Sequence, residues 1–154
     1  MLIDAPYTHQ LPLSEISLAS ILREQGYSTW HLGTEPYYPD KHGFEVNIGE
    51  CEYGLPKNGY KSPYNIPTMK NGETGEYLTD RITEEALRLI RERNTKKPFY
   101  MNLWHYAVHV PIQAPDEKMI EKYRDKAAEL GLDRVKTFEE GDFFLANIKK
   151  IRKS

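Results

Sequence analysis

The sequence predicts an α/β fold, because two short strand-like segments are separated by a helix-like one. Residues 99–104 are aromatic and apolar, too few for a comfortable globular helix, and follow Pro98, which suits the start of a strand. We expect them to form a buried, central strand. Residues 27–32 directly follow a helix closed by glycine, which is an ordinary α/β step. The intervening helix, about residues 80–93, predicts that the two strands are parallel and joined by a right-handed crossover.

The first helix is expected between Ser17, a good N-cap residue, and Gln25. Gly26 then supplies the left-handed position that commonly ends a helix. Its predicted apolar stripe consists of Leu18, Ile21 and Leu22.

Residues 33–78 differ from the rest of the chain in composition and show neither a helical nor a strand period. They contain seven of the ten glycines, five of the ten prolines and six of the eleven tyrosines, so we expect a long loop. Loops of this length are uncommon in compact domains, and they are usually functional or a sign of missing context. Two interpretations stay open: the tyrosines line a pocket, or they pack the loop on neighbouring structure.

Two further helices follow. The helix at 80–93 is predicted to be capped by Thr79 or Asp80, and the third is expected to run from Pro115 and Asp116 to Leu130. The apolar face of the former comprises Ile82, Ala86, Leu89 and Ile90, and that of the latter Met119, Ile120, Tyr123 and Ala127. The basic C-terminal residues are expected to be a solvated or frayed end.

Composition excludes several classes of protein. The length of 154 residues predicts one domain, and a net charge of −2 gives no field that would attract nucleic acid or an anionic membrane. The single cysteine, Cys51, excludes an internal disulfide. We expect no membrane partner, since no stretch approaches 18 apolar residues, and no signal peptide is recognisable at the N-terminus. The localisation is left open.

Three segments resemble the sulfatase family, specifically its bacterial arylsulfatase-type members within the alkaline phosphatase superfamily. Residues 105–115, His-Tyr-Ala-Val-His-Val-Pro-Ile-Gln-Ala-Pro, resemble a family segment that carries an active-site histidine. Trp-His-Leu-Gly at 30–33, followed by residues 35–45, resembles a second motif, and residues 75–86 resemble the family's approach to the strand. The segments occur in family order across about residues 11–145.

The resemblance implies that residues 1–154 are part of an N-terminal sulfatase domain, with a few parallel strands and flanking helices. It implies a sulfuric ester hydrolase that acts on a sulfate ester or another anionic substrate. Complete members use calcium, an oxygen-liganded hard cation, and are often periplasmic or secreted.

The resemblance also implies two catalytic residues. His31 stands at the place of the histidine that contacts the family's formylglycine nucleophile, and His109 at that of the histidine that protonates the leaving oxygen. Both are expected near the carboxyl edges of the two strands, beside the loop after Gly33, where open α/β sheets bind ligands. On spacing alone, His105 and His109 could instead belong to an ordinary loop after the strand and face water. His105 is interpreted as structural, and His9 and His42 as surface residues.

Several family features are absent from these 154 residues. Cys51 lacks the proline and arginine of the formylglycine motif, and Thr29 stands where the family has a lysine. No Asp-Asp pair precedes the first helix and no Asp-Asn pair follows the third, so no metal or cofactor is expected on this chain alone. We therefore expect an inactive sulfatase fragment; the alternative is a non-catalytic remnant that binds anions or a partner. A separate histidine metal site is not favoured by the wide spacing of the histidines.

Overall fold

The computed structural model describes residues 11–34, 38–51, 55–109 and 111–131. It contains three α-helices, one 3-10 helix and three strands within those residues. In chain order these are α1 (Leu18–Glu24), β1 (Ser28–Gly33), η1 (Pro39–His42), β2 (Val46–Ile48), α2 (Leu78–Glu92), β3 (Phe99–Trp104) and α3 (Glu117–Glu129).

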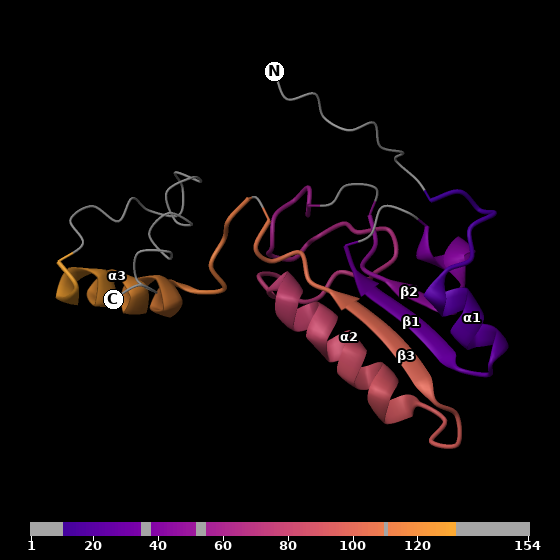
Figure 1. Cartoon of the computed structure of the whole chain (residues 1–154). Helices are drawn as coiled ribbons and strands as arrows, with labels where there is room; N and C mark the ends of the chain where they lie inside the picture. Colours follow the sequence, from indigo (N-terminus) through magenta and orange to yellow (C-terminus); the bar gives the residue numbers. More distant parts are fainter. Residues whose placement is uncertain (1–10, 35–37, 52–54, 110, 132–154) are drawn as a thin grey trace.

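The three strands form one parallel sheet with the order β2-β1-β3 (Figure 1). β1 and β3 are paired along their whole length, from Ser28 opposite Phe99 to Gly33 opposite Trp104. The connection between β1 and β3 contains α2, which packs against the sheet. The predicted parallel pair of strands and the α/β class are therefore confirmed.

The prediction that 99–104 is a buried central strand is wrong for the residues described. β1 lies in the middle of the sheet, whereas β3 is paired on one side only. Accordingly Phe99 and Trp104 are 37% and 48% exposed, while the last five residues of β1 are all buried. An apolar run of this kind suits a central strand or an edge strand. Its composition indicates that the strand packs against other structure, but not whether it is paired on one side or on both.

The two faces of β1 have different neighbours, as strand alternation requires. Trp30 and Leu32 belong to the hydrophobic core, together with Leu78, Ile82 and Ala86 of α2. Thr29, which points to the other face, donates from its Oγ1 to the carbonyl of Gly43 at 2.7 Å. The core therefore lies between the sheet and α2, and the opposite face meets the segment around η1.

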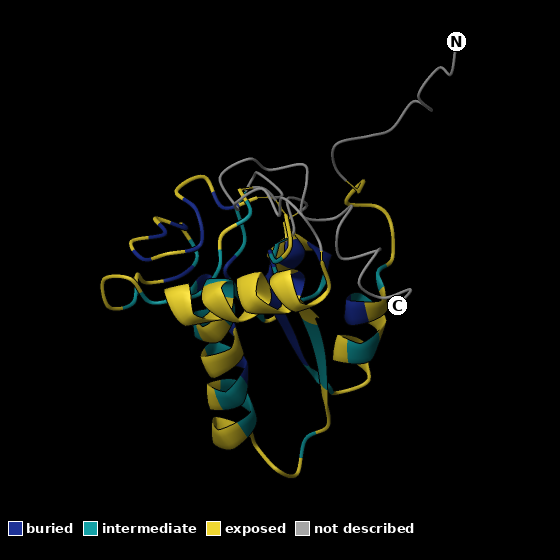
Figure 2. Cartoon of the chain, turned by 90° about the vertical axis from the view of Figure 1, so that its left-hand side faces the viewer, coloured by how far each residue is buried: buried dark blue, intermediate teal, exposed yellow. Residues whose placement is uncertain are grey.

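The long loop before α2 contributes to the core. Tyr60 and Tyr64 are each 1% exposed and join Ile66 and Met69 in the same cluster as the β1 side chains. Figure 2 shows buried segments within this loop, although it has little regular structure. Of the two interpretations of the tyrosine-rich segment, the structure supports packing for these two residues.

Helix α1 begins as predicted but buries a different face. The Ser17 hydroxyl accepts from the backbone N–H of Ser20 at 3.0 Å, which is N-capping, and Gly26 ends the helix with φ of +87°. However, Leu18 and Ile21 of the predicted stripe are 57% and 47% exposed. Among its seven residues only Ala19 is buried, and the helix packs on β1. The hydroxyl of the N-cap residue Ser17 donates to the carbonyl of His42 in η1.

Helix α2 begins earlier than predicted and without a side-chain cap. Its N-cap residue is Tyr77, not Thr79 or Asp80. The N–H of Leu78 donates instead to the carbonyl of Tyr60 at 2.8 Å, so the core loop satisfies one of the free amides that capping normally serves. The predicted apolar face is confirmed, with Ile82 and Ala86 buried and the rest of the face packed against the core.

Helix α3 is present as predicted, but its predicted apolar face is largely open. Asp116 is the N-cap and accepts from the Met119 N–H at 2.8 Å. Met119 and Tyr123 are 37% and 41% exposed, and Ala127 is the buried residue of the helix. Figure 1 shows why: α3 lies to one side of the sheet and its other helices.

Strand β2 was not predicted. It has three residues, and its pairing partner is the segment Trp30–Leu32 of β1. Three residues are too few to show a strand period in the sequence. Their strand conformation comes from the pairing with β1.

Within the described residues, no helix is long and apolar enough to cross a membrane. The basic C-terminal residues lie outside the described part of the chain.

Candidate functional site

His31 lies inside β1 and is completely buried. Its Nδ1 is 3.3 Å from Nδ2 of Asn102, the residue directly opposite on β3. The rings of Phe44 and Trp104 meet the imidazole edge-on, at centroid distances of 5.4 and 6.1 Å. Because Asn102 donates to Nδ1, the proton of the neutral imidazole sits on Nε2, which has no partner among the described residues.

Burial controls the charge of this imidazole. Removal from water lowers the pKa of His31 to about 4, and the backbone of Gly33 opposes that shift in part. His31 is therefore neutral at neutral pH. In the neutral imidazole Nδ1 accepts from Asn102, so the proton on Nε2 is the one available to donate a hydrogen bond to another group.

Asn102 was not identified from the sequence. It is an amide within an otherwise apolar and aromatic run. A polar side chain in such a run normally requires a hydrogen-bond partner, and this was the signal that could have identified it. Its partner, His31, is supplied by the parallel pairing of the two strands.

His109 lies in the loop that follows β3 and is exposed. Its backbone N–H donates to the carbonyl of Tyr106 at 2.8 Å, which closes a turn over residues 106–109. The hydroxyl of Tyr60 lies within hydrogen-bond distance of the carbonyls at both ends of this turn, Tyr106 at 2.6 Å and His109 at 3.0 Å, and its single proton is shared between them. The predicted catalytic histidine is thus held through its backbone, and its imidazole faces outward.

Tyr106 fixes the other side of the turn. Its ring is fully buried, and its hydroxyl donates to the carbonyl of Gly49 at 2.6 Å and contacts Sγ of Cys51 at 3.1 Å. Burial raises the pKa of this phenol, so the hydroxyl keeps its proton. Cys51 therefore serves in packing around Tyr106, consistent with its lack of the nucleophile motif.

We predict that Tyr106→Phe lowers the free energy of unfolding by about 1–3 kcal/mol, because the buried carbonyl of Gly49 loses its donor. The matched control is Tyr123→Phe on α3, whose ring is 41% exposed. This control should change stability by less than about 0.5 kcal/mol. Urea unfolding of both variants measures the difference, and equal losses would contradict the assignment.

The two predicted catalytic histidines come from neighbouring strands. His31 is two residues before the end of β1, and His109 follows the end of β3 by five residues. The ends of these strands touch, since the Thr34 N–H donates to the carbonyl of Trp104 at 2.9 Å. Both histidines are thereby associated with one carboxyl edge of the sheet, one buried within it and one exposed beyond it.

The remaining histidines have other positions. The prediction that His42 is a surface residue is wrong: it is 7% exposed, in η1, where its carbonyl accepts from the hydroxyl of Ser17 at 2.5 Å. The position is buried because α1 and η1 pack together. His105 is half-buried, and its Nδ1 has no partner among the described residues. His9 lies outside the described residues.

Thr29, at the place of the family's lysine, has a structural role. Its Oγ1 donates to Gly43 and accepts from the N–H of Glu45 at 3.2 Å. The carbonyl of Thr29 accepts from the same N–H at 2.8 Å. A fully buried threonine with these contacts ties β1 to the segment before β2 and carries no charge that could bind an anion.

The described residues do not fit a calcium site by themselves. No group of three or more His, Cys, Asp or Glu side chains lies close enough to hold a metal ion within that part of the chain. Calcium takes six to eight oxygen ligands from carboxylates, carbonyls and waters, and the described residues provide no cluster of carboxylates around which such a shell could form. No chemical step is assigned to a metal here.

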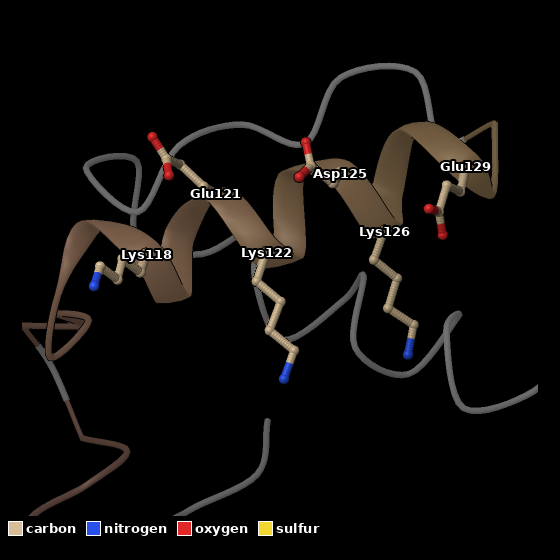
Figure 3. Close-up of a pocket in the computed structure, with 6 residues that line it drawn as sticks. All are labelled: Lys118, Glu121, Lys122, Asp125, Lys126 and Glu129. Carbon is tan, nitrogen blue, oxygen red and sulfur yellow. The ribbon is translucent and has the colours of Figure 1, made fainter.

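A hollow elsewhere on the surface has a different character. Figure 3 shows that its side chains project from a single helix, α3, and that acids and lysines alternate along it. The lining residues are Lys118, Glu121, Lys122, Asp125, Lys126 and Glu129. Three positive and three negative charges on one solvated helix face balance each other, and we assign no binding role to them.

The fold and site together define an α/β domain with a buried neutral histidine and an exposed histidine associated with one carboxyl edge of a parallel sheet. The family model described as "Sulfatase" matches residues 2–135, most of the chain. The chain belongs to the sulfatase family, and the predicted resemblance is confirmed.

Individual relatives agree with this assignment. The chain is 32% identical to arylsulfatase J of Mus musculus over 132 residues and 32% identical to N-acetylgalactosamine-6-sulfatase of Homo sapiens over 127 residues. These alignments cover 74% and 68% of the chain. It is also 27% identical, over 73% of its length, to an uncharacterised sulfatase of Schizosaccharomyces pombe. The chain spans between 22% and 24% of the length of these relatives.

Proposed function

We propose that this chain supplies the histidine-bearing part of a sulfatase catalytic domain, in which His31 and His109 act on a sulfate ester. Residues 1–154 would then form part of an N-terminal sulfatase domain. The observation that carries the proposal is the pairing of β1 with β3, because it associates both histidines with the same edge of the sheet. Membership of the sulfatase family supplies the substrate class.

The two histidines suit different tasks. The exposed imidazole of His109 can reach a bound ester and protonate its leaving oxygen as a general acid. The imidazole of His31, neutral because its pKa is about 4, carries its proton on Nε2 and can hold the attacking group by donating a hydrogen bond from that atom. Desolvation makes such a buried hydrogen bond stronger than it would be in water.

The attacking group itself is not supplied by these 154 residues. The sequence contains no Cys or Ser followed by the proline-or-alanine and arginine pattern of the family motif. Without a nucleophile there is no covalent route, and the loss of one group that stabilises developing charge costs about a hundred- to a thousand-fold in rate. A general acid alone accelerates little.

We therefore predict that the purified chain, incubated with 4-nitrophenyl sulfate and calcium, releases 4-nitrophenol no faster than buffer does. The absorbance of the phenolate measures this directly. Turnover that disappears in His109→Ala would contradict the expected inactivity and require another nucleophile. Turnover that survives His109→Ala would have a source other than this site.

The role of His109 can be tested without turnover. Addition of 4-nitrophenyl sulfate to the isotope-labelled chain should shift the imidazole resonances of His109 more than those of His42, which is buried in η1. The matched ligand control is 4-nitrophenol, which lacks the sulfate group. Equal shifts with both ligands, or none at His109, would contradict the proposed sulfate contact.

A further inference from the structure

The turn that carries His109 is attached to one phenol. Its closing hydrogen bond joins residues 106 and 109, and the hydroxyl of Tyr60 reaches the carbonyl oxygens of both residues, at 2.6 and 3.0 Å. One hydroxyl therefore sits across both ends of the turn. The backbone of His109 cannot move away from Tyr106 without losing this shared donor.

A second attachment holds the far end of the same loop. The backbone N–H of Tyr60 donates to Oε1 of Gln113 at 2.6 Å, and the hydroxyl of Tyr77 donates to the Gln113 carbonyl at 2.9 Å. The rings of Tyr60 and Tyr77 are stacked with centroids 5.6 Å apart. The two tyrosines thus form one platform, but only the Tyr60 hydroxyl contacts the turn that contains His109.

Tyr60 is itself rigidly placed. It is 1% exposed within the core, and its carbonyl accepts from the N–H of Leu78, at the start of α2. Burial raises the pKa of Tyr60 to about 12, so the hydroxyl stays protonated and remains a donor throughout the neutral range. A rigid donor of this kind is what precise placement of a reacting group requires.

We propose that Tyr60 is a positioning residue for His109. Through its hydroxyl it fixes the 106–109 turn and hence the point from which the His109 imidazole projects beyond β3. This proposal rests on the proposed role of His109 in sulfate ester hydrolysis. In that reaction a misplacement of about 1 Å in a catalytic group can cost about a hundred-fold in rate.

The test compares Tyr60→Phe with Tyr77→Phe in the full 154-residue chain. Each variant keeps its ring and the stacking and loses one hydroxyl bonded to the 105–113 loop, so the two are closely matched. Amide hydrogen exchange is measured by NMR at His109 and at the β1 amides. Loss of the Tyr60 hydroxyl should accelerate exchange at His109 about tenfold or more, beyond any change at β1.

Tyr77→Phe should leave the exchange of His109 within about twofold of the wild type, because the turn keeps its donor. A merely structural role for Tyr60 would accelerate His109 and the β1 amides by the same factor, and this result would overturn the proposal. Equal acceleration of His109 in the two variants would overturn it as well.

A measurement on the wild-type chain covers the case in which Tyr60→Phe fails to fold. Nuclear Overhauser contacts between the Tyr60 ring and the α-protons of Tyr106 and His109 are expected, and their absence overturns the proposal. The titration with 4-nitrophenyl sulfate separates the two claims. Selective exchange at His109 without a sulfate-dependent shift would support the positioning role of Tyr60 and contradict the proposed function alone.

Discussion

Replacing Gly33 with alanine is expected to lower the free energy of unfolding by about 3–5 kcal/mol, from backbone strain and overpacking together. Gly33 ends β1 with φ of +110°, a conformation that side chains disfavour. A Cβ built there would lie 1.5 Å from the carbonyl oxygen of Trp104 on the paired strand. Since that oxygen belongs to backbone, relief requires β1 and β3 to separate.

Gly26→Ala is the matched control. Gly26 also has positive φ, +87°, but a Cβ there would meet nothing within 4 Å. Only conformational strain remains, and the expected loss is about 1–2 kcal/mol. Urea unfolding followed by tryptophan fluorescence reports on both variants, because Trp30 and Trp104 lie in the two strands. Equal losses would show that the close approach at Gly33 is not a constraint.

The free energy of unfolding is expected to fall as the pH is lowered through the range in which an exposed histidine takes up a proton. Its folded pKa, about 4, lies below the ordinary histidine value of 6.5, so the folded state binds fewer protons than the unfolded one. This contribution is fully present above the unfolded pKa and is lost progressively as the pH falls to the folded pKa. Between about pH 7 and about pH 5, the expected loss is about 2 kcal/mol.

His31→Gln is the variant that isolates this contribution, because glutamine does not titrate in this range. Carboxylates titrate in both proteins, so the difference between their stability-pH curves belongs to His31. The free energy of unfolding from urea titrations at several pH values gives both curves. Parallel curves would contradict the assignment of a buried neutral imidazole that charges only on unfolding.

Features with a local cause could be predicted. Apolar periodicity identified the face of α2, Ser17 was identified as a cap, Asp116 as part of the start of α3, and Gly26 as the end of α1. Each depends on residues within a few positions of one another, whose preferences act before any tertiary contact forms. The parallel pairing of β1 and β3 also followed, from the helix between them.

Features with a distant partner could not be predicted. Leu78 begins α2 with its amide bonded to Tyr60, so no capping side chain marked the boundary. Strand β2 depends on β1 for its conformation. The burial of His42 depends on α1 folding against η1, which no pattern in its own neighbourhood indicates.

By itself, the sequence determined the α/β class, most element positions and the family, and it predicted two catalytic histidines, since these depend on residue identity and local order. Only the tertiary structure decided how these histidines are held. His31 is neutral because β3 and its aromatic neighbours remove it from water, and Asn102 fixes its tautomer. The backbone of His109 is placed by Tyr60, 49 residues earlier in the chain. Burial and hydrogen bonds between distant segments form only when the chain folds. They determine the charge of His31 and the position of His109, whereas residue identity determines only that both side chains are imidazoles.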